Sequence, residues 1–210
     1  EAAGINDFTG AGVYYGAATT EAQACRDQDI YIVGGGNSAG QAAMYLSKFS
    51  SRVYITIRKA NLSHSMSSYL IEQIIKTENI ELLPFTEVVE AKGNGKLEQV
   101  VLRNNQNDTT RQCGAGMLLI FIGARPYTDW IPIDVIKNKK GFLMTGSTLK
   151  GEDGFRRFWK LAREPYLLET SHPGIFAAGD VRSGAMNRVA SAVGEGAMAI
   201  KFVHQYLAEN

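Results

Sequence analysis

The residue types that could bind a phosphate group are concentrated between Gly34 and Ala39, which read Gly-Gly-Gly-Asn-Ser-Ala. This G-x-G-x-x-A pattern follows an apolar, β-branched segment and precedes an alanine-rich one. Gly34 permits a tight turn, Gly36 leaves room for a pyrophosphate, and Ala39 allows a helix to pack closely on a strand. A helix that begins here would offer free N–H groups to the anion. The pattern predicts a dinucleotide site formed by Gly34, Gly36, Asn37, Ser38 and Ala39, although an ordinary glycine turn would have the same sequence.

A basic pair, Arg58 and Lys59, follows the next apolar segment. In NAD-binding versions of the motif an acidic residue stands here, about 20 residues on, and holds the ribose 2′-hydroxyl. Two cations instead favour a 2′-phosphate, because both can pair with it and no carboxylate repels it. The pair therefore predicts NADP(H) in preference to NAD(H), with a solvated basic turn as the alternative.

Two further polar positions follow apolar segments. Residues 171–180 read Ser-His-Pro-Gly-Ile-Phe-Ala-Ala-Gly-Asp, and a strand over 174–179 would place the Asp180 carboxylate at the carboxyl edge of a sheet. There Asp180 could accept hydrogen bonds from a polyol. Gly123-Ala-Arg-Pro126 ends another apolar run in the same way. Gly179-Asp180 also has the sequence of a plain turn, and for residues 123–126 a plain turn is an equal alternative.

The elements around these motifs predict an α/β fold. Strands over 29–34, 52–57 and 80–83 alternate with helices over 38–49 and 67–77, which requires parallel strands with right-handed crossovers. A hairpin of 87–92 and 97–103, leading to an apolar run at 117–123, predicts a β-meander on this Rossmann-like unit. Later segments predict a short helix over 155–162, a buried strand over 174–179 and a long helix over 187–207.

Composition excludes several classes of protein. With 210 residues, 45% of them hydrophobic and 20% charged, the chain resembles an ordinary globular protein rather than a disordered one. A net charge of +1 gives no basic surface for nucleic acid. The longest apolar run, 117–124, is too short to span a membrane. Cys25 and Cys113 are far apart and form no CxxC, so we expect no disulfide, no metal site and a cytoplasmic location.

Together, the glycine loop, the basic pair, the exit at Gly123 to Pro126 and PGIFAAGD before a long helix resemble the thioredoxin reductase superfamily. These are FAD- and NAD(P)-dependent pyridine nucleotide-disulfide oxidoreductases. Residues 12–22 and 188–196 resemble the branch that is fused to response-regulator or cyclic-nucleotide-binding domains. The resemblance extends over nearly the whole chain.

The resemblance implies a flavoenzyme in which NADPH reduces FAD. Residues 1–126 would form the NAD(P)H-binding domain, and 127–210 would form the C-terminal part of a second Rossmann-like domain that binds FAD. Asp180 would hold the flavin ribitol, and the start of the last helix would face the isoalloxazine. The further cofactor-binding positions that we carry over are Gly123, Gly179, Arg188, Val189 and Ala190. A homodimer is also implied.

Three departures from the family pattern affect the expected activity. The redox-active CxxC should fall near residues 16–20, which read Gly-Ala-Ala-Thr-Thr, so electrons would pass to an unknown acceptor without a dithiol. The further arginine expected after the basic pair is absent from residues 60–63. The first FAD-binding glycine motif is absent, because Gly10-Ala-Gly12 reads as a linker turn. We therefore expect a segment of a longer protein that binds NADP(H) and holds FAD weakly or not at all, with no catalytic side chain of its own.

The sequence is consistent with two other functions. One is a redox sensor that reports NADP(H) or flavin state to a fused regulatory domain. The other is a ferredoxin or flavodoxin NADP reductase, for which Arg156, Arg157, Lys160 and Arg163 could form a basic docking face. A solvated helix face explains those four cations equally well. In the thioredoxin reductase reading, hinges are expected near residues 14–20 and 125–128.

Overall fold

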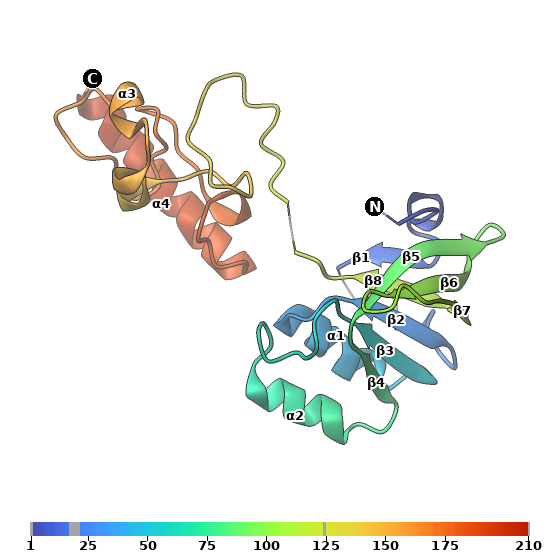
Figure 1. The fold of residues 1–210 in the computed structure, drawn as a ribbon. Coiled ribbons are helices and arrows are strands. Elements are labelled where there is room, and N and C mark those ends of the chain that lie inside the picture. The colour runs from blue at the N-terminus through green and yellow to red at the C-terminus, as the bar shows by residue number, and fades with distance from the viewer. Residues whose placement is uncertain (1, 17–21, 124, 210) are drawn as a thin grey trace. The chain divides into compact units, whose positions relative to one another are not determined.

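The computed structural model describes residues 2–16, 22–123 and 125–209. The chain divides into two compact units, Glu1–Gly123 and Ala124–Asn210 (Figure 1). This division lies close to the boundary expected at residue 126. Which cofactor each unit binds stays a prediction.

The first unit is built on a five-stranded sheet in the order β1-β8-β2-β3-β4, in which every pair is parallel. The central β2 pairs with β3 on one side and β8 on the other, so that Ile32 lies opposite both Ile55 and Leu119. The layers on the two sides of the sheet bury both faces of this central strand, which explains its apolar sequence. The five strands are β1 Val13–Tyr15, β2 Asp29–Val33, β3 Arg52–Thr56, β4 Ile80–Leu83 and β8 Met117–Ile120.

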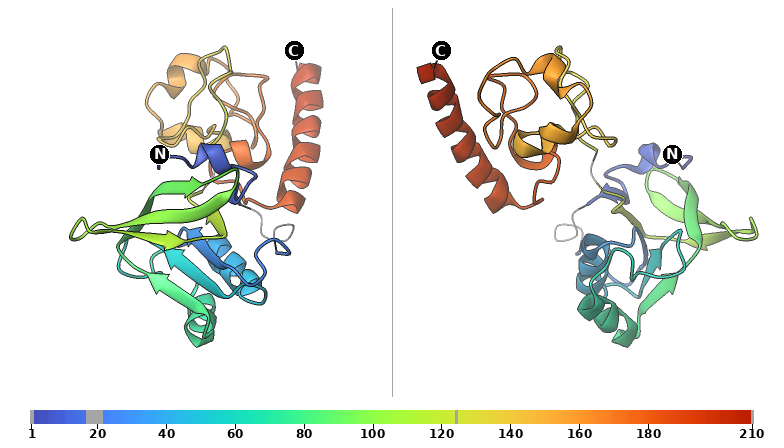
Figure 2. Two further views of the ribbon diagram at one scale, coloured as in Figure 1. Left: turned by 90° about the vertical axis from the view of Figure 1, so that its right-hand side faces the viewer. Right: turned by 60° about the vertical axis from the view of Figure 1, so that its left-hand side comes forward.

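Helices cover one face of this sheet, and a second sheet covers the other (Figure 2). Because side chains alternate along a strand, Ile30 and Ile32 pack against α1, Asn37–Leu46, and α2, Ser68–Lys76, whereas Tyr31 faces the opposite way. Small side chains of α1 allow close approach to the sheet. All of the expected helices and strands of this α/β segment are present, with ends shifted by at most a few residues.

The second sheet of this unit is an antiparallel meander of β5, Thr86–Gly93, β6, Leu97–Asn104, and β7, Thr110–Gly114. Its apolar side chains, Val100 and Leu102 among them, share a core with the parallel sheet. The hairpin expected from the sequence is confirmed, but β1 and β7 were not foreseen. Gly10 and Gly12 lie in the turn after the 3-10 helix η1, Asn6–Phe8, as a linker turn requires.

The second unit contains little regular structure. Its elements are the 3-10 helix η2 Gly146–Gly151, α3 Phe155–Phe158, the 3-10 helix η3 Gly179–Val181 and the long helix α4 Val189–Glu209 (Figure 2). α3 is shorter than expected, because Trp159 leaves the helical region at φ −90° and ψ 107°. α4 begins two residues later and ends two residues later than expected.

The prediction of a strand over residues 174–179 is wrong. Among the described residues, this segment pairs only through Phe176, which forms one isolated antiparallel bridge with Glu169. A single β-branched and aromatic segment becomes a strand only where neighbouring backbone completes its hydrogen bonds. Asp180 consequently lies in η3, at the end of an irregular segment rather than at the edge of a sheet.

Candidate functional site

A pocket of about 790 Å³ opens at the carboxyl ends of β2 and β3. Gly34 and Gly35 line one part of it, and Arg58 and Lys59 line another. The carboxyl edge of a parallel sheet is where ligands bind in open α/β folds. Two groups of residues that were predicted separately, the glycine loop and the basic pair, therefore border one cavity.

The three glycines of the loop meet different structural demands. Gly34 has φ +140°, and a Cβ atom placed on it would lie 2.5 Å from the carbonyl oxygen of Phe121. The fold itself therefore requires glycine there. At Gly36, a Cβ atom would have within 4 Å only one atom of the described residues, the carbonyl oxygen of Ser65 at 4.0 Å. Open space remains beside the Gly36 backbone, as a bound pyrophosphate would need.

Helix α1 begins directly at this open space. Gly36 is its N-cap, no side chain caps it, and its first main-chain bond joins the Gly40 N–H to the Gly36 carbonyl at 3.1 Å. The preceding N–H groups at the start of a helix are free to bind an anion. Asn37 and Ser38 are exposed here, and Ala39 is fully buried against the sheet.

The loop that follows β3 braces the glycine loop. The Ser65 hydroxyl donates to the Gly35 carbonyl at 2.8 Å. The Asn37 side-chain oxygen accepts from the Ser67 N–H at 2.9 Å and from the Ser67 hydroxyl at 3.1 Å. Asn37 thus connects the glycine loop to the loop that follows β3 through its side-chain oxygen.

The β-meander fixes the backbone of the basic pair. Phe85 donates its N–H to the Lys59 carbonyl at 3.2 Å, and the Asn105 amide donates to the Arg58 carbonyl, also at 3.2 Å. Both basic side chains are exposed. Asn61, Ser65 and Arg103 line the same pocket but were not foreseen. Arg103 comes from β6, and nothing in the local sequence connects it with the glycine loop.

In the second unit, Gly179 is held by the carboxylate of Glu195 on α4. The Gly179 N–H donates to Glu195 Oε2 at 2.8 Å, and Arg182 pairs with both carboxylate oxygens. The hydrogen bonds from Arg182 lower the pKa of Glu195. Asp180 is exposed in the adjacent turn.

The other predicted positions of the second unit lie at the start of α4. Arg188, Val189 and Ala190 are all exposed, and the Arg188 carbonyl accepts the Ala192 N–H at 3.0 Å. These three residues therefore lie at the start of the same helix whose Glu195 accepts the Gly179 N–H. Gly123, the last residue of the first unit, has φ +92°, and its neighbour Ile122 lines the pocket at β2 and β3.

The basic docking face suggested by the sequence is incomplete. Arg163 is largely buried and forms two hydrogen bonds with the fully buried Glu169, at 2.7 and 3.0 Å. Its guanidinium also lies over the rings of Trp159, Tyr166 and Tyr206. Arg163 therefore stabilises the second unit and is not a free surface cation.

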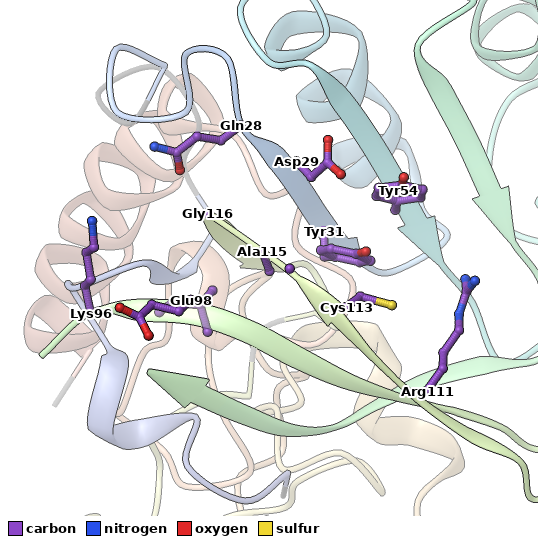
Figure 3. A pocket seen from close by; sticks show the side chains of 12 residues that line it. Gln28, Asp29, Tyr31, Tyr54, Lys96, Glu98, Arg111, Cys113, Ala115 and Gly116 are labelled. Atoms are coloured by element: carbon purple, nitrogen blue, oxygen red, sulfur yellow. The ribbon is translucent and has the colours of Figure 1, made fainter. Parts of the chain in front are cut away.

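A second pocket, of about 610 Å³, lies at the opposite edge of the parallel sheet, beside Asp29 at the amino end of β2 (Figure 3). Its floor includes Tyr31 stacked on Tyr54, with ring centroids 4.7 Å apart. Burial is the main cause that raises the pKa of Tyr31, and a hydrogen bond with Cys113 raises it further. Side chains of both charges line this pocket, so its chemistry indicates no particular ligand.

Cys25 does not have the surroundings of a redox-active thiol. Cys25 is fully buried, and burial raises the pKa of its thiol, which disfavours the reactive thiolate. Both cysteines are free. Of the segment where the family dithiol was expected, Gly16 is described, and residues 17–20 lie outside the described residues.

Residues 3–196 match the protein family described as pyridine nucleotide-disulphide oxidoreductase, so the chain belongs to this family. Among its relatives, the thioredoxin reductase of Peptoclostridium litorale is 28% identical over 212 residues, which cover 98% of this chain and 60% of the relative. The thioredoxin reductase of Chlamydia trachomatis serovar D is 30% identical, with the same coverage.

The fold agrees with this family. The crystal structure of Lactococcus lactis thioredoxin reductase superposes with a TM-score of 0.78 at 26% identity, covering 100% of this chain and 62% of that one. The resemblance to thioredoxin reductases and the Rossmann-like fold class are thereby confirmed. The chain spans about three fifths of the length of these relatives.

The described residues contain neither a candidate membrane span nor a candidate metal cluster. No helix among them combines the length and the apolar character needed to cross a membrane. Within the same residues, no three His, Cys, Asp or Glu side chains gather as they would around a metal ion.

Proposed function

We propose that this chain is part of an NADPH-dependent flavoprotein oxidoreductase, in which the first unit binds NADP(H). The observation that carries the proposal is the single pocket bordered by the glycine loop and the basic pair. The membership of the chain in an oxidoreductase family supports the same reading. Bound NADPH would supply a hydride, and FAD would accept it.

The residues of the first unit fit a dinucleotide with a 2′-phosphate. The open space at Gly36 and the start of α1 would receive the pyrophosphate, with N–H groups of Asn37, Ser38 and Ala39 as donors. Arg58 and Lys59 would pair with the 2′-phosphate, since both are exposed and their backbone is fixed. Gly34 shapes the turn, and Gly123 would border the cofactor beside Ile122.

The second unit would contribute part of an FAD site. Asp180 is exposed on a turn fixed by Glu195, which suits a carboxylate that accepts hydrogen bonds from ribitol hydroxyls. The exposed start of α4, with Arg188, Val189 and Ala190, would lie at the isoalloxazine, where the positive end of the helix dipole stabilises negative charge. We expect residues 127–210 to hold FAD weakly by themselves.

The acceptor of the electrons is not a dithiol of the family type at residues 16–20, because that segment contains no cysteine. Electrons would therefore pass from the flavin to an external acceptor of unknown identity. A homodimer, a cytoplasmic location and a fused regulatory domain belong to the same proposal.

The experiment that tests the proposal is a titration of the purified chain with NADPH and with NADH, followed by nucleotide fluorescence, together with an absorbance spectrum for flavin. We expect NADPH to bind more tightly than NADH, and flavin to be substoichiometric. Binding of neither nucleotide would refute the proposal for the first unit. Stoichiometric flavin would show that the flavin site is already complete in this chain.

A further inference from the structure

Arg103 on β6 lines the same pocket as Arg58 and Lys59. Its side chain is 44% exposed, so a ligand could reach it. A guanidinium group in a nucleotide pocket is a candidate for binding phosphate, since it has five N–H donors in a planar arrangement.

Glu87 on the neighbouring strand β5 holds Arg103 in place. The two residues lie directly opposite each other in the β5–β6 pair, and Arg103 Nη2 donates to Glu87 Oε2 at 3.0 Å. Among the described residues, this is the one hydrogen bond between the two side chains, and it uses one Glu87 oxygen and one Arg103 nitrogen. The other N–H groups of Arg103 are therefore available to a second anion.

The end of β6 is also joined to the basic pair through the backbone. Asn105, two residues after Arg103, donates its N–H to the Phe85 carbonyl at 2.8 Å and its side-chain amide to the Arg58 carbonyl at 3.2 Å. Phe85 in turn donates to the Lys59 carbonyl. The position of Arg103 relative to the basic pair is thus fixed by hydrogen bonds.

The charges around the pocket favour a dianion. Its lining includes three cations, Arg58, Lys59 and Arg103, and one carboxylate, Glu87. Without Arg103, the Glu87 carboxylate would be unpaired and would repel a phosphate. A phosphate monoester carries close to two negative charges at neutral pH, whereas a ribose hydroxyl carries none.

We propose that Arg103, oriented by Glu87, is the third cation of the 2′-phosphate subsite and determines the preference for NADP(H) over NAD(H). This inference rests on the proposed function, in which the pocket binds a dinucleotide. The loop after the basic pair, residues 60–63, contributes no cation of its own, so the additional charge comes from the β-meander.

The test compares Arg103→Gln with Arg111→Gln by isothermal titration with NADPH, NADH and 2′,5′-ADP at low salt. Arg111 is a matched control, because it is an exposed arginine of the same antiparallel sheet on β7 and does not line this pocket. We expect Arg103→Gln to weaken NADPH and 2′,5′-ADP about 5- to 20-fold and NADH less than about 2-fold. The NADPH effect should shrink at high salt, which screens exposed charges.

A second variant separates the roles of the two members of the ion pair. Glu87→Gln keeps a hydrogen-bond acceptor for Arg103 but removes the opposing charge, so NADPH should bind at least as tightly as to the wild type. If Glu87→Gln weakens NADH while Arg103→Gln leaves NADPH unchanged, Glu87 is a ribose ligand and the inference is overturned.

The failure of this inference is distinguishable from failure of the proposed function. Wild-type protein that binds NADPH, together with an Arg103→Gln variant of equal affinity, overturns only the role of Arg103. Wild-type protein that binds neither nucleotide overturns both. Unfolding midpoints of each variant, compared with Arg111→Gln, show that a loss of binding is not a loss of folding.

Discussion

Glu195 accepts a hydrogen bond from the main-chain N–H of Gly179, with 2.8 Å between nitrogen and oxygen, and so attaches the turn that carries Asp180 to the long helix α4. The contact is close: a Cβ atom on Gly179 would lie 3.3 Å from the Cβ of Ala192. Arg182, on the same turn, completes the attachment by pairing with the Glu195 carboxylate. Both charged side chains are only 16% exposed.

Glu195→Gln should destabilise the second unit by about 1–2 kcal/mol at pH 7, because it weakens charge-assisted hydrogen bonds to Arg182 and Gly179. Since the pKa of Glu195 is lowered in the folded state, its contribution is complete above the ordinary value of 4.5 and is lost as the pH falls below it. The difference between wild type and variant should therefore narrow in acid. Urea unfolding at several pH values measures this difference in unfolding free energy. The control is Lys201→Gln, an exposed position on the same helix. An undiminished difference at pH 3 would contradict this account.

Gly34 and Gly36 should respond differently to alanine. Gly34→Ala should destabilise the first unit by about 2 kcal/mol or more, because the residue has a positive φ and its methyl group would meet the Phe121 carbonyl. Gly36→Ala should leave stability within about 0.5 kcal/mol, because the space there is open. It should nevertheless weaken NADPH binding at least tenfold, since its methyl group enters the space meant for the pyrophosphate. Thermal unfolding and nucleotide titration of both variants test the contrast, and equal nucleotide affinity of Gly36→Ala and wild type would contradict it.

Glu169→Gln should cost the second unit about 3 kcal/mol, because it removes the buried negative charge that pairs with the Arg163 guanidinium. The carboxylate is fully buried and also accepts the N–H groups of Tyr166 and Gly174. Denaturant unfolding of the wild type and of Glu169→Gln measures this loss of stability. The control is Glu81→Gln, whose ion pair with Arg52 is about half exposed and should be worth less than about 1 kcal/mol. Equal losses in the two variants would show that burial of the pair does not matter.

Tyr31→Phe should make the first unit more resistant to alkali. Because burial raises the pKa of Tyr31, the folded state favours the protonated phenol, and this contribution is lost as the pH rises above the ordinary value of 10.0. The wild type should thus lose stability relative to Tyr31→Phe between about pH 9 and pH 11. Urea midpoints across that range provide the measurement, with the exposed Tyr127→Phe as the control. Parallel curves for the wild type and Tyr31→Phe would refute the prediction.

Local sequence patterns correctly predicted the elements that depend on contacts between residues close together in the sequence. The alternation of β2, α1 and β3 and the turn of the β5–β6 hairpin followed from periodicity and glycine placement. The strand over 174–179 was wrong because a strand also depends on a neighbouring backbone, and only Phe176 has one here. The short β1 and β7 were missed because their few residues show no clear alternation.

The sequence by itself determined the α/β class, the glycine loop and the basic pair, since each depends on residue types at short spacing. Only the tertiary structure decided that Arg103 and Glu87 belong to the pocket of that loop, and that Glu195 fixes the turn of Asp180. The physical reason is that these contacts join strands and helices far apart in the chain. Their geometry is set by the packing of whole sheets and helices, which no local pattern records.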